Sequence, residues 1–175
     1  AHDGAFQIHG DEPEEEACLG PDVVGHDGGH PLGVELLLHL ILESVLPVLR
    51  IHIKKKGLEK MPGEGRFLLV CNHLFIADPG IVLHCFKKSQ LAFVTKQENQ
   101  QLFIVGKIMH KILCQPIGRE NDRSALKTIL KCISLIREDK VSVGVFPEGY
   151  TSKDGKLHPF RPGVFKIAQK TGVPI

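Results

Sequence analysis

The stretch V-S-V-G-V-F-P-E-G, residues 141–149, determines how the rest of the chain is interpreted. Its first six residues are apolar or small, as is typical of a buried strand. The Pro-Glu-Gly that follows does not continue such a strand and is typical of a turn. We therefore predict a strand over 141–146 that ends in a turn bearing the carboxylate of Glu148.

Strand and helix patterns alternate along the chain on either side of this stretch. Further strands are predicted at 66–71, 91–95 and 114–117, and another opens at 173–175. Helices are predicted from Pro79 with Asp78 as N-cap, over about 98–113, from Asp122 or Ser124, and over 162–170. The helix that starts at Asp122 or Ser124 has one apolar face, formed by Ala125, Ile129, Ile133 and Ile136. This alternation predicts an α/β fold, in which helices flank a largely parallel sheet.

The first 56 residues differ in composition from the rest. Residues 1–33 are rich in Gly, His and acids and lack any period, which predicts a disordered or extraneous leader. Residues 34–49 are the long apolar run, but they are too short and too polar for a membrane span. With the basic residues that follow, 34–56 predicts an amphipathic helix and basic segment at a membrane interface. A core helix followed by a charged edge strand is the alternative, and the main domain is expected at 57–175.

The net charge of +2 hides a strong asymmetry. Residues 1–49 contain ten acids and no Lys or Arg, whereas 50–175 hold all 22 basic residues and ten acids, a net charge of +12. The second part is therefore the candidate for binding anions such as phosphate, coenzyme A, an acidic carrier protein or anionic lipid. Solvated lysines on helix faces are the alternative explanation. No nucleic-acid partner is expected.

The cysteines argue against a disulfide or zinc framework. There are five, an odd number, and none forms a C-x-x-C pair, which favours a reducing cytosol. The N-terminus lacks the basic and apolar regions of a signal peptide. The first Met is Met61, and the chain stops where a strand opens at 173–175. We therefore expect a piece of a longer protein, truncated at the C-terminus of its domain.

The segment C-N-H-L-F-I-A-D, residues 71–78, places a histidine and a carboxylate five positions apart. On a continuous helix such residues lie about 140° from each other and share no face. His73 follows a predicted strand, however, and Asp78 begins the next helix, so the intervening loop can fold back. Asp78 would then accept the imidazole N–H and leave the other ring nitrogen of His73 free as a general base.

The pair lacks an accompanying nucleophile. No Ser or Cys stands at a strand-to-helix elbow, which favours direct attack by a substrate hydroxyl. Two alternatives remain for the pair alone. One is a structural histidine beside an N-cap aspartate, and the other is a two-ligand metal site, for which the sequence offers no third ligand nearby. No metal is expected.

Taken together in order, these segments and the blocks that accompany them resemble the 1-acylglycerol-3-phosphate (lysophosphatidic acid) acyltransferases, a family of glycerolipid acyltransferases. The resemblance covers residues 58–175. The blocks are Asn72–Asp78 for N-H-x-x-x-x-D, Pro116–Arg119 for the arginine block, Phe146–Ser152 for F-P-E-G-T-R-S, Phe160–Gly163 for F-x-x-G, and Val173–Ile175 for V-P-[IV].

The resemblance implies a role for each matching position. His73 would deprotonate the acceptor hydroxyl, which attacks the acyl thioester directly, and Asp78 would orient His73. Lys96 and Arg119 would hold the acceptor phosphate, for which arginine offers a forked donor set. Gly149 would let the backbone approach the acceptor closely. The substrate-binding set implied in this way is Asn72, Lys96, Arg119, Phe146, Pro147, Glu148, Gly149 and Tyr150.

The chain departs from the family pattern in two places. Tyr150-Thr151 stands where the family has Thr-Arg, so the arginine that is often assigned to the phosphate is missing. Arg161 or Lys153 could replace it, or Arg119 and Lys96 could suffice. The stretch Leu102–Gly106 also lacks the proline that is common there.

The activity that the resemblance implies is transfer of a fatty acyl group to 1-acylglycerol 3-phosphate, forming phosphatidic acid. The donor would be acyl-coenzyme A or acyl carrier protein, with no metal or tightly bound cofactor. The domain would sit on the cytoplasmic face of the membrane, held by residues 34–56. The alternatives are another acceptor, such as glycerol 3-phosphate or another lysophospholipid, a non-catalytic module that binds lipid phosphate, and a thioester hydrolase.

Overall fold

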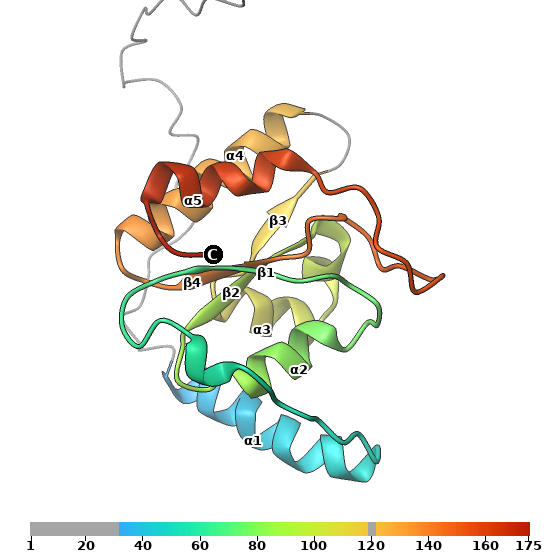
Figure 1. Ribbon diagram of the computed structural model, residues 1–175. Coiled ribbons are helices and arrows are strands. Elements are labelled where there is room, and N and C mark those ends of the chain that lie inside the picture. The colour runs from blue at the N-terminus through green and yellow to red at the C-terminus, as the bar shows by residue number, and fades with distance from the viewer. Residues whose placement is uncertain (1–31, 119–121) are drawn as a thin grey trace, which may run out of the picture. The chain divides into compact units, whose positions relative to one another are not determined.

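The computed structural model describes residues 32–118 and 122–175 of the chain (Figure 1). The leader predicted at 1–33 lies outside the described residues apart from Leu32 and Gly33, which belong to the first helix. Arg119, one of the two predicted phosphate ligands, also lies outside them.

A parallel sheet forms the centre of the molecule. Its strands are β1 (Leu68–Val70), β2 (Leu91–Lys96), β3 (Gln115–Ile117) and β4 (Ser142–Val145). They lie in the order β1-β4-β2-β3, and every neighbouring pair is parallel. Val143 of β4 stands opposite Leu68 on one side and Ala92 on the other. The prediction of an α/β fold with a largely parallel sheet is confirmed.

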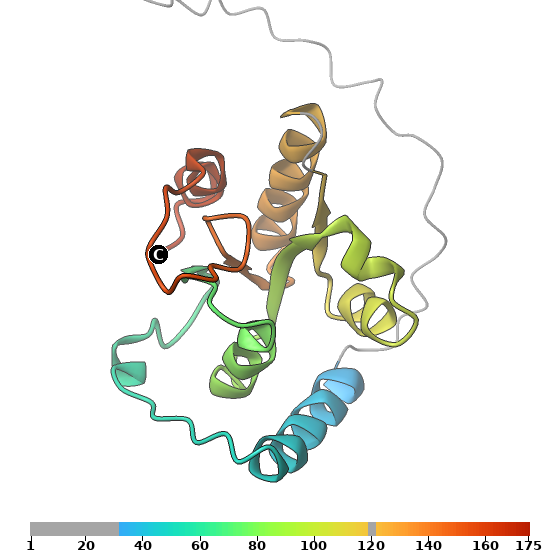
Figure 2. The same ribbon diagram turned by 90° about the vertical axis from the view of Figure 1, so that its right-hand side faces the viewer.

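Helices cover both faces of this sheet (Figures 1 and 2). On one face lie α4 (Asp122–Arg137) and α5 (Lys166–Thr171), the latter preceded by η3 (Pro162–Phe165). On the other lie α2 (Asp78–Cys85) and α3 (Val105–Lys111), with α1 (Leu32–Val48) packed on α2. A further short helix, η1, spans Leu58–Lys60. Parallel neighbours require crossovers of this kind, because each strand must return to the same end of the sheet.

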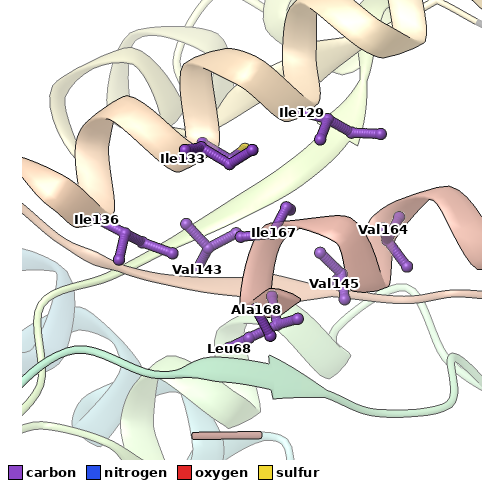
Figure 3. Packing of buried hydrophobic residues seen from close by; sticks show 10 residues of the cluster. Leu68, Ile129, Ile133, Ile136, Val143, Val145, Val164, Ile167 and Ala168 are labelled. Atoms are coloured by element: carbon purple, nitrogen blue, oxygen red, sulfur yellow. The ribbon is translucent and has the colours of Figure 1, made fainter. Parts of the chain in front are cut away.

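The predicted apolar face of the 122–137 helix is buried in the larger core. Ile129, Ile133 and Ile136 pack on Val143 and Val145 of β4, together with side chains of α5 (Figure 3). Burying branched aliphatic side chains stabilises the fold by roughly 1.5–3 kcal/mol each. The core on the other face joins Phe67 and Phe93 of the sheet region to α2 and α3.

The prediction of a single helix over 98–113 is wrong. The segment is divided into η2 (Gln97–Gln101) and α3, because the backbone turns to an extended conformation at Leu102. The two pieces meet closely at Gly106, where an added Cβ would lie 2.0 Å from the carbonyl oxygen of Gln100. Only glycine fits this approach. The periodicity of the sequence does not reveal such a backbone contact.

The end of the chain also differs from the prediction. The helix predicted over 162–170 is present as η3 and α5, and it ends at Gly172 in the left-handed conformation. Residues 173–175 do not form the predicted strand. The carbonyl of Pro174 does accept a hydrogen bond from Leu68 N at 2.9 Å, so the segment runs beside β1. Since proline lacks an N–H, it does not continue the ladder.

The predicted N-terminal helix is present as α1, and it has two unlike sides. Leu46 is buried, and Leu38 packs against the core that α2 and α3 share. The rest of the helix exposes six apolar side chains, Leu36, Leu37, Leu40, Ile41, Val45 and Val48. Residues 51–56 form no strand, so the alternative of a charged edge strand is wrong. Within residues 32–118 and 122–175, none of the helices has the length and apolar character needed to span a bilayer.

Candidate active site

His73 and Asp78 meet in the loop that connects β1 to α2. His73 Nδ1 lies 3.0 Å from Asp78 Oδ2, and both side chains are largely shielded from solvent. The predicted N-cap role of Asp78 is wrong, since the helix begins at Asp78 itself and Ala77 is the cap residue. The carboxylate instead points back over the loop, where it accepts N–H groups from the preceding residues.

The loop fixes the carboxylate of Asp78 with three donors. Leu74 N and Phe75 N each donate to Oδ2 at 2.8 Å, in addition to the contact with His73. The first turn of α2 also favours a negative charge at this position. In the tautomer that donates from Nδ1, the imidazole of His73 keeps Nε2 available to accept a proton. The arrangement is that of an oriented general base.

The turn after β4 packs against His73, because β1 and β4 are adjacent and parallel. The Phe146 ring stacks on the imidazole with centroids 4.3 Å apart, and its other neighbour is the Phe93 ring at 5.5 Å. The backbone is joined as well, since Ser152 N donates to the carbonyl of His73 at 2.7 Å. The Asn72–Asp78 and Phe146–Ser152 segments, widely separated in sequence, therefore form one structural unit.

The Phe-Pro-Glu-Gly turn buries its carboxylate. Gly149 N donates to Phe146 O at 3.0 Å, and Gly149 has a φ of +77° that favours glycine. Glu148 is only 2% exposed, and within the described part of the chain neither of its carboxylate oxygens has a hydrogen-bond partner. Buried carboxylates are normally hydrogen-bonded. The oxygens of Glu148 are therefore candidates to accept hydrogen bonds from a ligand.

Arg161 lies beside the same turn. Its backbone N donates to Pro147 O at 2.8 Å, and an added Cβ on Gly149 would be 2.9 Å from its Nε. The guanidinium therefore covers Gly149, close to the motif position at which the expected arginine is missing. Arg161, one of the two cations that could replace that arginine, is in contact with the turn.

Three other predicted binding residues, Asn72, Lys96 and Tyr150, lie at or just beyond the carboxyl ends of their strands. Lys96 ends β2, is exposed, and pairs with Glu98 at 3.0 Å. The exposed Tyr150 ring lies 5.4 Å from the ring of His158. Asn72 is exposed at the mouth of a pocket beside Asp78. The structure thus joins His73, Asp78 and the Phe146–Gly149 turn directly, whereas Lys96 and Tyr150 contact other residues.

A pocket of about 190 Å³ opens beside the carboxylate of Asp78. Its lining is mostly apolar and consists of Cys71, Asn72, Leu74, Asp78, Ile81, Val82 and Phe146. Four of these residues were not among the predicted site residues: Cys71, Leu74, Ile81 and Val82. Ile81 and Val82 lie one turn into the helix that Asp78 begins. Burial, and secondarily the charge of Asp78, raises the pKa of the Cys71 thiol to about 11. Cys71 is therefore protonated at neutral pH and is a poor nucleophile.

Ser152 is a further residue that was not among the predicted site residues. It is buried, and its hydroxyl lies 2.9 Å from Asp154 Oδ1 and 3.0 Å from Lys156 O. His158 donates to the same Asp154 oxygen, and this bond, followed by those from Lys156 N and Ser152, lowers the pKa of Asp154 to about 2. Ser152 thus tethers the loop to His73 through its backbone. Its place at the end of the F-P-E-G block was the available signal.

The described residues contain no cluster of three or more His, Cys, Asp or Glu side chains that could hold a metal ion.

Comparison with known proteins gives a consistent result. A family model described as acyltransferase matches residues 52–175. The 1-acyl-sn-glycerol-3-phosphate acyltransferase BAT2 of Brassica napus is 33% identical over 75% of this chain and 37% of its own length. The 1-acyl-sn-glycerol-3-phosphate acyltransferase of Borreliella burgdorferi is 26% identical over 80% of this chain and 55% of its own length. The chain therefore spans about one third to somewhat over half of these relatives.

A solved structure of a related enzyme shares the fold. The crystal structure of the 1-acyl-sn-glycerophosphate (LPA) acyltransferase PlsC from Thermotoga maritima matches with a TM-score of 0.70 at 24% identity. The match covers 82% of this chain and 56% of that chain.

Proposed function

The chain belongs to the acyltransferase family, and on that premise we propose that it acylates the free hydroxyl of 1-acyl-sn-glycerol 3-phosphate to form phosphatidic acid. The observation that carries the proposal is the His73–Asp78 pair, oriented by three hydrogen bonds and stacked on the turn after β4. The acceptor is the one for which the related enzymes of Brassica napus and Borreliella burgdorferi are named.

The proposed reaction is a direct transfer with His73 as the base. His73 Nε2 accepts the proton of the acceptor hydroxyl while the hydroxyl oxygen forms a bond to the thioester carbonyl carbon. The carbon–sulfur bond of the tetrahedral intermediate then breaks, and the thiolate leaves with a proton from the imidazolium. Asp78 stabilises the positive charge on His73 between these two steps. The base is regenerated in the second step.

Two observations support direct transfer over an acyl-enzyme intermediate. Cys71, the thiol nearest Asp78 in the pocket, has its pKa raised to about 11 and is neutral at physiological pH. The hydroxyl of Ser152 contacts Asp154 and Lys156 O, so no Ser–His pair is formed there. An acceptor hydroxyl that reaches His73 is then the attacking group.

The acceptor head group is proposed to bind at the Phe146–Gly149 turn. The oxygens of Glu148 would accept a hydrogen bond from the glycerol moiety, which would satisfy its buried carboxylate. Arg161, placed over Gly149, would bind the phosphate with its forked donors. Lys96 and Arg119 complete the proposed phosphate ligands. The fatty acyl donor would be acyl-coenzyme A or acyl carrier protein, with no metal or bound cofactor required.

A membrane location follows from the nature of the acceptor. The exposed apolar side of α1 and the basic residues of 50–56 would hold the domain on the cytoplasmic face of a membrane. Basic residues close to an anionic surface contribute about 1 kcal/mol each.

The proposal is tested by product analysis with the purified chain, an acyl-coenzyme A and lysophosphatidate. We expect phosphatidic acid that depends on both substrates, measured by mass spectrometry. Free fatty acid released without acceptor would indicate a hydrolase instead. Lysophosphatidate binding without turnover would indicate a binding module, and faster acylation of glycerol 3-phosphate or another lysophospholipid would change the acceptor.

Replacing Arg161 separates phosphate recognition from chemistry. We expect Arg161→Ala to raise the KM for lysophosphatidate by about tenfold or more, because a hydrogen bond to a charged group contributes roughly 1.5–3 kcal/mol. The kcat should change little, since Arg161 does not contact the reacting atoms. Steady-state kinetics with the two acceptors lysophosphatidate and monoacylglycerol measure the effect.

Monoacylglycerol lacks the phosphate and is the matched control acceptor. The Arg161→Ala change should leave the KM for monoacylglycerol unaltered. Arg161→Lys should give an intermediate KM for lysophosphatidate, because lysine keeps the positive charge but lacks the two parallel N–H donors of the guanidinium. An equal loss on both acceptors would show that Arg161 supports the turn and does not bind phosphate.

A further inference from the structure

Four consecutive apolar residues are exposed where η2 leads into α3. We call Leu102–Val105 the 102–105 tip. Phe103 is 78% exposed and Ile104 is 67% exposed, and Leu102 and Val105 are also open to solvent. Soluble proteins rarely present such runs to water, and where they do, the run usually marks an interaction site.

A second exposed apolar tip lies within the active-site loop itself. Leu74–Ile76, the 74–76 tip, stands between the two residues of the His73–Asp78 pair, and Ile76 is 83% exposed. The backbone of this loop is fixed by the bonds from Leu74 N and Phe75 N to Asp78, and by Asp78 N donating to Phe75 O at 3.0 Å. With the backbone held in this way, Phe75 and Ile76 stay exposed to solvent, and Leu74 is half-exposed where it lines the pocket.

The two tips belong to the same edge and face of the sheet. Each follows a parallel strand, β1 or β2, and each precedes a helix of the same layer, α2 or α3 (Figure 2). Side chains of both helices, including Val82 of α2 and Met109 of α3, pack against one core. The 74–76 and 102–105 tips therefore lie on the side of the molecule where the site is located.

Cations accompany the apolar side chains of the 102–105 tip. Lys107 Nζ lies 4.2 Å from the centroid of the Phe103 ring, and Lys111 is exposed on the same helix. An apolar tip followed by lysines on the next helix is suited to the boundary between acyl chains and anionic head groups. An acidic carrier protein would match the lysines, but it would not need the four exposed apolar residues.

We propose that the 102–105 and 74–76 tips insert into the surface of an anionic lipid bilayer beside the active site. The acceptor lipid then keeps its acyl chain in the bilayer, and only its glycerol phosphate has to rise to His73. The acceptor part of this inference rests on the proposed function, whereas the docking surface itself rests on the exposed residues. The surface is distinct from the apolar side of α1.

Vesicle flotation tests the docking surface with variants outside the proposed catalytic and binding groups. The chain is floated with vesicles of phosphatidylcholine containing phosphatidylglycerol, and with vesicles of phosphatidylcholine alone. We expect Phe103→Ser with Ile104→Ser to lower partitioning onto the anionic vesicles about tenfold or more. Wild type should bind the neutral vesicles more weakly, and salt should reduce its anionic binding.

The matched control is Leu126→Ser with Leu130→Ser on α4. These leucines are 50% and 57% exposed, on the helix that covers the opposite face of the sheet. The control should bind vesicles like wild type, and thermal melting should show that both double variants are folded. Unchanged binding of the Phe103/Ile104 variant would assign docking to α1 or another surface and overturn the proposal. Equal loss in both double variants would also overturn it.

Transfer assays keep this inference separate from the proposed function. The Phe103/Ile104 variant should lose transfer to lysophosphatidate embedded in vesicles, and it should keep transfer to a short-chain, monomeric acceptor. A wild-type chain that docks through the 102–105 tip but transfers no acyl group would refute the function and leave the docking surface standing. Normal transfer to embedded lysophosphatidate by the variant would refute the docking surface alone.

Discussion

His73→Ala lowers the rate of acyl transfer by about 10²–10⁴-fold, the contribution that a positioned general base makes. The variant loses the only group that the proposed reaction uses to deprotonate the acceptor hydroxyl. It also loses the ring that stacks on Phe146, which should lower the free energy of unfolding by about 1 kcal/mol. Phosphatidic acid formation, measured under saturating substrates, should fall while the melting transition remains cooperative.

Two further variants distinguish the loss of the base from other effects of replacing a histidine. His110→Ala removes an exposed histidine from α3 and should retain wild-type activity. His73→Gln can still donate an N–H to Asp78 but is not a base, so it should be as inactive as His73→Ala. A folded His73→Gln enzyme with more than about a tenth of the wild-type rate would refute the base mechanism.

Asp78→Asn lowers kcat by about 10²-fold or more and leaves the KM for the acceptor within about threefold. The amide keeps the size of the side chain but removes the negative charge that stabilises the His73 imidazolium. Asp78 is a positioning residue, because it acts on the reaction through His73 and its bond at 3.0 Å. A lower kcat with a nearly unchanged KM is the result that a purely structural role of Asp78 would not give.

The same change should destabilise the loop. Leu74 N and Phe75 N exchange an acceptor with a full charge for a neutral one, and the first turn of α2 loses a favourable charge. Together these effects should lower the free energy of unfolding by about 1–2 kcal/mol in chemical denaturation. Asp139→Asn removes a carboxylate paired with Arg66 at the opposite end of the sheet and is the control. It should leave kcat unchanged, and an equal fall in kcat would contradict the role of Asp78.

Much of the fold followed from local patterns in the sequence. The apolar run of 141–146 predicted β4, and the spacing of Ile129, Ile133 and Ile136 predicted the buried face of α4. These predictions succeed because burial of one face imposes the period of a helix, and burial of both faces imposes a continuous apolar run. Such a pattern can be recognised within one helix or strand, without knowing which elements pack against it.

Contacts between segments that are distant in sequence were harder to predict from the sequence. The break between η2 and α3 depends on the approach of Gly106 to the backbone of Gln100, which no periodicity records. The N-cap assignment failed at Asp78 because its carboxylate turns back toward Leu74 and Phe75. In both cases the deciding interaction is a particular geometry, and the residue type alone does not specify it.

The sequence alone determined the α/β class, the family resemblance and the proposal that His73 and Asp78 act as a pair. The tertiary structure decided which groups surround that pair. Because β1 and β4 are neighbours, it brings Phe146 onto the imidazole of His73 and encloses Glu148 without a partner among the described residues. It also places Arg161 over Gly149. These relations depend on strand order and on loop paths in space, which distance along the chain does not encode.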